Sequence, residues 1–147
     1  MKTIMRATRL FLILAPVLLA PTATVLAADF KLVVNAANTV SSLTPDEAAQ
    51  YFLKKKTTWS GGQAVQPVDL TDDSAPRLAF SKAVLKKDVG AVKSFWQTQI
   101  FSGRAVPPPE KGSDAAVLAY VEANPGAIGY VSAGAVLGRG VREVSVN

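Results

Sequence analysis

Residues 121–131, "VEANPGAIGYV", contain the change from a helix to a strand on which the fold assignment depends. The residues just before it, "SDAAVLAYVEA" (residues 113–123), predict a helix with Ser113 as its N-cap, and "NPG" (residues 124–126) ends that helix. "AIGYV" (residues 127–131) then predicts a short strand, because it is an apolar run that follows a break. A helix that passes directly into a strand indicates an α/β protein.

The same alternation occurs upstream. "KLVVNA" (residues 31–36) predicts a buried strand. The helix after it is expected to begin at Thr44, because Pro45 stands at the first helical position and Glu47 completes a capping box. "AVQPVDL" (residues 64–70) reads as a further strand, and its proline predicts a sheet edge or a bulge.

Two more helices and a last strand complete the prediction. The helix that begins near Ser74 is expected to bury one face, which contains Phe80, Ala83 and Val84. Apolar residues recur at helical spacing in residues 88–101, and "REVSV" (residues 142–146) predicts a strand. The expected fold class is therefore α/β, with a mixed or largely parallel sheet flanked by helices.

The N-terminal segment has the features of a secretory signal peptide. A basic start with Lys2, Arg6 and Arg9 precedes an apolar run, and small residues then offer a cleavage site after Ala27. Residues 1–27 are therefore expected to be a cleaved signal, and residues 28–147 a single periplasmic domain. A retained N-terminal anchor is the alternative, but the apolar run is shorter than the ~20 residues that span a bilayer.

Composition excludes several kinds of function. The predicted signal holds three positive charges and no acid, so its removal lowers the net charge from +5 to +2 and leaves no argument for nucleic-acid binding. The chain has no Cys and no His, which excludes Cys or His nucleophiles, Ser-His-Asp triads and ordinary zinc sites. No motif for an enzyme or a cofactor is present, so we expect a protein that is not an enzyme.

The stretch "DLTDDSAPRLAF" (residues 69–80) raises the functional question. A helix that begins after Ser74 could bind an anion at its free N–H groups. Asp72 and Asp73 stand directly before it and would repel an anion. The alternative is a simple cap, with Asp73 or Ser74 closing the helix and Arg77 paired with Asp73.

Four segments together resemble one family. They are "VVNAANTVSSLTPDEAAQYF", "TTWSGGQAVQPVDL", "DSAPRLAF" and "VEANPGAIGYV". They resemble the phosphate-type substrate-binding proteins of bacterial ABC transporters, in particular a short, PstS-like variety. The resemblance implies a single lobe of the type II periplasmic-binding-protein fold, whose ligand lies at helix N-termini.

The resemblance also places family residues on this sequence. Ser74 and Phe80 match the Ser and Phe of the family's R-x-x-G-S-G-T stretch and its following helix. Ala75 and Pro76 replace the Gly and Thr, and Leu70 stands where the family has its Arg. The proline removes a hydroxyl and an N–H donor, so this end of the site is poorer in donors than the family's.

Two functions follow from this reading. The first is an exported solute-binding protein that binds phosphate or a related oxyanion for ABC-type uptake, with an ABC permease as partner. Its expected contacts are, from the helix start, Ser74, Ala75 and Arg77, and, from the loop after the first strand, Asn38, Thr39 and Ser41. One lobe offers half a clamp, so tight binding would need a homodimer, a partner or a loop as lid. The alternative is an envelope interaction or accessory protein that has lost its solute site.

Overall fold

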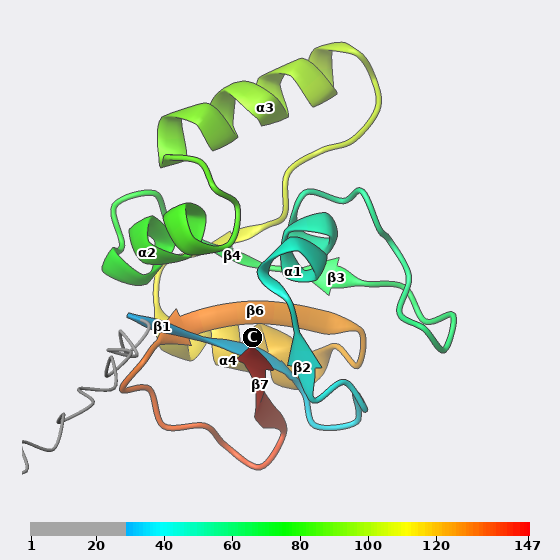
Figure 1. The fold of residues 1–147 in the computed structure, drawn as a ribbon. Coiled ribbons are helices and arrows are strands. Elements are labelled where there is room, and N and C mark those ends of the chain that lie inside the picture. Colours follow the sequence, from blue (N-terminus) through cyan, green and yellow to red (C-terminus); the bar gives the residue numbers. More distant parts are fainter. Residues whose placement is uncertain (1–28) are drawn as a thin grey trace, which may run out of the picture.

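Helices and strands alternate along the described part of the chain (Figure 1), which in this computed structural model covers residues 29–147. The predicted signal peptide, residues 1–27, lies outside the described residues. Among residues 29–147, the helices are all too short or too polar to cross a membrane.

A five-stranded sheet forms the centre of the fold. Its strands lie in the order β2 (Ser42–Leu43), β7 (Val141–Val146), β1 (Phe30–Asn35), β6 (Ala127–Ser132) and β3 (Gln66–Pro67). The central strand β1 is antiparallel to both of its neighbours, whereas the two short edge strands run parallel to theirs. The sheet is therefore mixed, which was one of the two expected arrangements.

The strand predicted over residues 64–70 is in fact two short strands. β3 pairs with β6, and β4 (Asp69–Leu70) pairs in parallel with β5 (Glu110–Lys111) to form a separate two-stranded sheet. The division comes after Val68, whose N–H still donates to the carbonyl of Ile128 at 2.9 Å. Pro67 lies on an edge strand, as its missing N–H predicted.

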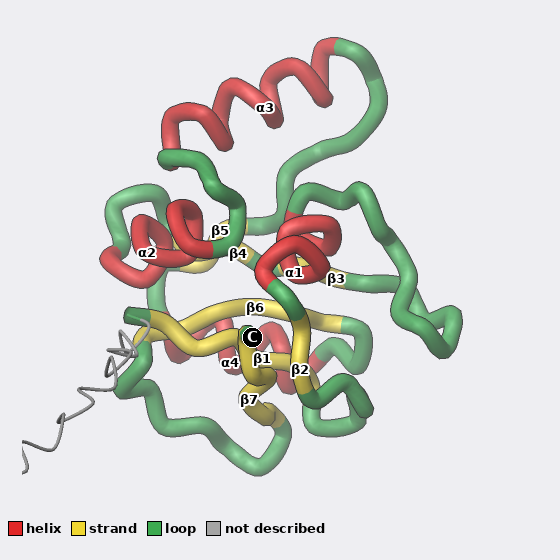
Figure 2. Tube along the Cα trace, viewed as in Figure 1, coloured by secondary structure: helices red, strands yellow, loops and turns green. Residues whose placement is uncertain are grey.

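Within residues 29–147, four helices surround the sheets: α1 (Pro45–Phe52), α2 (Ala75–Ala83), α3 (Val89–Phe101) and α4 (Asp114–Ala123). Figure 2 shows α1 and α2 on one side of the central sheet and α4 on the other, with α3 standing apart beyond α2. The side chains of β6 explain these layers, because successive residues of a strand face opposite sides. Tyr130 stacks on Phe80 of α2, while a Cβ placed on Gly129 would touch Val117 of α4 at 2.9 Å.

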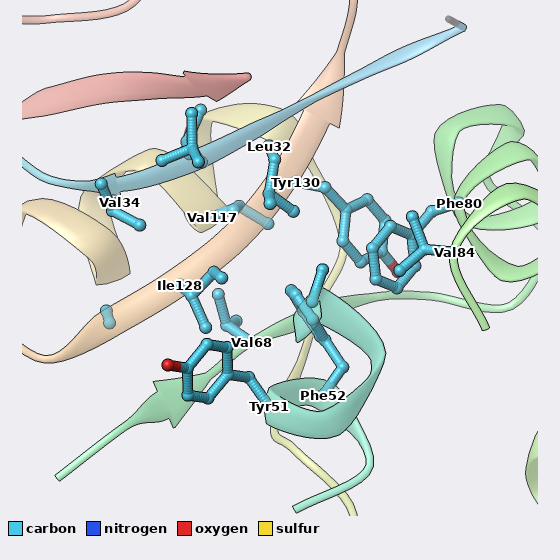
Figure 3. Close-up of a cluster of buried hydrophobic side chains, with 14 of the residues drawn as sticks. Leu32, Val34, Tyr51, Phe52, Val68, Phe80, Val84, Val117, Ile128 and Tyr130 are labelled. Carbon is cyan, nitrogen blue, oxygen red and sulfur yellow. The ribbon is translucent and has the colours of Figure 1, made fainter. Parts of the chain in front are cut away.

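Aromatic side chains form the centre of the core between the sheet and α1 and α2 (Figure 3). The ring of Phe80 stacks on Tyr130 with a centroid separation of 3.9 Å. The rings of Phe52 and Phe30 approach the Phe80 ring edge-on, with centroid separations of 4.6 and 5.5 Å. Such contacts add ~0.5–1.5 kcal/mol per pair beyond burial, so Phe80 contributes strongly to the packing of α2 against the sheet.

One detail of the helix predictions is wrong. Ala83 is exposed, and the buried face of α2 consists of Pro76, Arg77, Phe80 and Ser81, followed by the cap residue Val84. In α3, burial is limited to Val92 and Trp96, whereas Ile100 is exposed. The periodicity of α3 predicts a helix correctly but cannot show how little of the protein packs against it.

The "NPG" turn packs against the earlier "TTWSGGQ" turn. The carbonyl of Gly126 accepts from the indole Nε1 of Trp59 at 3.0 Å and from the N–H of Gln66 at 2.9 Å. A Cβ on Gly126 would lie 2.1 Å from the carbonyl oxygen of Ala64, so only glycine fits there. The close approach to Ala64 explains the glycine of the "NPG" turn, whereas in the earlier turn Gly62 has a positive φ of 86°, which glycine adopts without strain.

The predicted capping box of α1 is present and supports a first prediction. The Thr44 N–H and Oγ1 donate to Oε2 of Glu47 at 2.8 and 3.0 Å, and Thr44 Oγ1 accepts from the Glu47 N–H at 3.2 Å. The bonds to Thr44 hold the pKa of Glu47 below its usual value, so the carboxylate's stabilisation is present at neutral pH and is lost as the pH falls through that lowered pKa.

Thr44→Ala removes the hydroxyl from this box. We expect urea melts to show a loss of about 1 kcal/mol. The pKa of Glu47, measured by NMR, should rise toward its ordinary value because the side-chain bond is gone. An unchanged pKa would contradict a functioning box.

Candidate functional site

Two helices begin at the same edge of the small parallel sheet. β4 leads into α2 and β5 leads into α4, and the two strands pair with Leu70 opposite Lys111. Just beyond the strands, the Thr71 N–H donates to the Lys111 carbonyl at 3.0 Å. Since parallel strands end at a common edge, the N-termini of α2 and α4 lie together there.

Each of the two helices begins with a serine cap. Ser74 Oγ accepts from the Arg77 N–H at 3.3 Å, and Ser113 Oγ accepts from the Ala116 N–H at 3.2 Å. The other first-turn N–H groups of a helix have no acceptor within the helix, and the helix dipole adds positive potential. Pro76 contributes no N–H, so α2 offers one donor fewer than α4.

A buried polar cluster lies at the start of α2. The Arg77 guanidinium forms a salt bridge with Asp69, and both side chains are almost completely buried. The Tyr130 hydroxyl donates to Asp69 Oδ1 at 2.6 Å and accepts from the Leu70 N–H at 3.2 Å. This cluster fixes β4, α2 and β6 relative to one another.

The pKa values in this cluster follow from burial and from the ion pair. Burial raises the pKa of Asp69, and Arg77 and the Tyr130 hydroxyl oppose that effect only in part. Burial would lower the pKa of Arg77, but Asp69 and Tyr130 more than offset this, so the pKa of Arg77 lies above its usual value. Burial and Asp69 also raise the pKa of Tyr130, which therefore keeps its proton and donates it.

The predicted pairing of Arg77 with Asp73 is wrong. Arg77 pairs with Asp69 and, at 3.9 Å, approaches Asp72, which in turn forms a salt bridge with Lys93 of α3. Asp73 is exposed. Contact of Arg77 with a ligand stays a prediction, and it would require the guanidinium to leave a buried carboxylate.

The predicted residues of the first loop lie elsewhere. Asn38 and Thr39 line a pocket of about 220 Å³ together with Lys56 and Trp59. This loop follows the end of β1 (Figure 1). In contrast, Phe80 of α2 contacts Phe30 at the start of β1. The six residues predicted as one set of contacts are therefore divided between two ends of the strand.

Hydrogen bonds to its backbone carbonyls hold this loop against β7. The side chain of Arg142 donates from Nε to the Asn38 carbonyl at 2.8 Å and also binds the Val40 carbonyl. The Ser41 carbonyl accepts from the Ser145 N–H at 3.1 Å. The backbone of this loop is thus anchored to β7, a structural role that the sequence pattern did not indicate.

Sequence reasoning missed a second hollow beside α2, between α3 and the small sheet. It has a volume of about 350 Å³ and is lined by Asp69, Arg77, Lys93, Trp96, Gln97, Ile100, Pro107 and Glu110. Burial and the nearby carboxylates of Asp72 and Asp69 raise the pKa of Glu110. The one signal in the sequence was Asp69 itself, an acid within the apolar run of a predicted strand.

Comparison with known proteins places this geometry in a structural context. No protein-family model and no curated protein matches the sequence. The fold matches an ABC-type phosphate transport receptor from Vibrio cholerae, with a TM-score of 0.61 and 21% identity over 79% of this chain and 45% of that chain. It also matches PstS from Borrelia burgdorferi, with a TM-score of 0.64 and 13% identity over 81% of this chain and 47% of that chain.

A third match holds a ligand. It is a protein from Clostridium perfringens described as a phosphate ABC transporter substrate-binding protein with bound phosphate, with a TM-score of 0.63 and 23% identity over 80% of this chain and 44% of that chain. The chain thus spans less than half the length of these proteins. The comparison confirms the expected fold class, a single lobe of the periplasmic-binding-protein type, and these structural neighbours are binding proteins.

Proposed function

We propose that this chain is an exported solute-binding protein, which binds phosphate or a related oxyanion in the periplasm at the edge where α2 and α4 begin. The observation that carries the proposal is the parallel pairing of β4 with β5, which brings two helix N-termini to one edge. Two positive helix ends supply more N–H donors and more potential than one end. The structural neighbours named for phosphate transport support the choice of ligand.

The contacts in this proposal are the hydroxyl groups and backbone N–H groups of the two helix starts. Ser74 and Ala75 supply those of α2, and Ser113 and Asp114 supply those of α4. Arg77 positions α2 through Asp69. Contact of Asn38, Thr39 and Ser41 with a ligand stays a separate prediction, because their loop follows the other end of β1.

We expect the affinity to be modest. The positive charge of Arg77 is balanced by Asp69, and that of Lys93 by Asp72, so neither of these two cations adds net positive charge beside the helix starts. The structural neighbours suggest delivery of the ion to an ABC permease. With a modest affinity, that delivery would depend on release of the ion as much as on its binding.

The test is a thermal melt with phosphate, sulfate or chloride at constant ionic strength. At a concentration ten times its dissociation constant, a ligand should add ~1.4 kcal/mol to the free energy of unfolding. For a domain of this size, that raises the melting temperature by about 5 °C. Ala75→Glu places an acid in the first turn of α2, and Ala115→Glu adds a second acid to the first turn of α4, beside Asp114. A first-turn acid favours the helix itself, so each variant should remain folded but lose the phosphate-dependent shift.

Ala91→Glu is the matched control, because Ala91 is an exposed alanine in the first turn of α3, a helix that is not part of the proposed site. This variant should keep the full phosphate shift. A shift that survives both site substitutions would place any phosphate elsewhere on the protein and would contradict the proposed site.

The second candidate function is that of an envelope interaction protein without a solute. One observation favours it: the arginine at the start of α2 is enclosed in a salt bridge, and Asp72 and Asp73 precede the helix. This function predicts no melting shift with any oxyanion, together with a stable complex with another envelope protein.

A further inference from the structure

The C-terminal end of α3 is an apolar protrusion. Ile100, Phe101 and Val106 are 49%, 89% and 62% exposed. Figure 1 shows this end of α3 far from the central sheet, with the loop to β5 leading back to the body. An exposed phenylalanine among other exposed apolar side chains indicates a surface that another molecule covers.

A hollow lies directly beside this protrusion. It is the 350 Å³ pocket described above, and its apolar walls are Trp96, Ile100 and Pro107. Gln97, which lines the pocket, and the protruding Phe101 are one helical turn apart, so hollow and protrusion belong to one continuous face of α3. We call residues 93–107 and the pocket they border the α3 face.

Charge distinguishes the two parts of the α3 face. Residues 94–109 contain one charged side chain, Arg104, which is exposed and positive. Three acids, Asp69, Asp72 and Glu110, lie in or beside the pocket, against two bases, Arg77 and Lys93. The protrusion is therefore positive and the pocket is net negative.

We propose that a second copy of this chain covers the α3 face in a twofold-symmetric dimer. In this dimer Phe101 of each copy enters the pocket of the other, and Arg104 faces the partner's Glu110. A twofold interface requires a surface that is complementary to itself, and a positive apolar protrusion beside a negative apolar-walled pocket meets that requirement. An anionic membrane fits less well, because the acids of the pocket would face its headgroups.

The dimer is tested by sedimentation velocity over a range of concentrations, on the full chain expressed with its own N-terminal segment. Phe101→Ser should raise the dissociation constant of the dimer at least about 30-fold, as loss of a central aromatic contact does. Val136→Ser is the matched control, because Val136 is equally exposed, at 88%, but lies between β6 and β7. It should leave the dissociation constant unchanged.

A charge exchange tests the pairing itself. Arg104→Glu and Glu110→Lys should each weaken the dimer about tenfold, and the double variant should regain most of the lost affinity. Both side chains are exposed, so the single variants should keep the melting temperature of the monomer. A chain that stays monomeric up to about 1 mM, a double variant no tighter than the singles, or binding of Phe101 to anionic vesicles instead would each overturn the proposal.

Discussion

Replacing Arg77 with methionine should lower the free energy of unfolding by about 3–5 kcal/mol, measured by urea denaturation at pH 7. The substitution leaves the buried Asp69 carboxylate without its cation. The hydrogen bond from the Tyr130 hydroxyl then has to stabilise the charge in a site shielded from water. An exposed arginine carries no such cost. Arg139→Met, at an exposed position in the loop before β7, should therefore change stability by less than about 0.5 kcal/mol.

The pH dependence and a double variant identify the cause. Without Arg77, the pKa of Asp69 is raised further in the folded state, so the deficit should shrink as the pH falls toward 4 and Asp69 becomes neutral. Asp69→Asn combined with Arg77→Met keeps an acceptor for Tyr130 without a buried charge, and it should recover at least about half of the loss. A double variant as unstable as Arg77→Met alone would show that packing, and not the uncompensated charge, sets the cost.

Phe80→Ala should cost a similar amount, about 3–5 kcal/mol, because the side chain is completely buried and its removal leaves a cavity. The ring contacts Tyr130, Phe52 and Phe30, which come from three other elements. Thermal and urea melts measure the loss. Leu78→Ala on the same helix, at a side chain 47% exposed, should cost much less, and equal losses for the two variants would contradict this description of the core.

The sequence predicted those elements whose signals are local. The caps at Thr44 and Ser113, the helix end at Asn124 and the strands of residues 30–35 and 127–132 all depend on neighbouring residues. The division of residues 64–70 into two strands was not predictable in this way. It depends on the partner strands, which lie more than 40 residues further along the chain.

The candidate site shows the same limit. Ser74 as cap followed from its place before a helix, but the partner of Arg77 did not, because Asp69 and Asp73 are both within reach in the sequence. Burial decides between them: Asp69 points into the protein beside Tyr130, and Asp73 faces solvent. The common position of the α2 and α4 N-termini likewise depends on the pairing of β4 with β5, which no single stretch of the sequence encodes.

The position of β1 has a consequence for how the chain acquires its structure. This first strand is the middle of the central sheet, and both of its neighbours come from residues 127–146. Until those residues have been synthesised, β1 has no strand to pair with on either side, and its buried side chains lack the neighbouring strands. A ribosome-bound chain is thus without its central sheet until residues 127–146 have been made, and folding must close a loop of about a hundred residues.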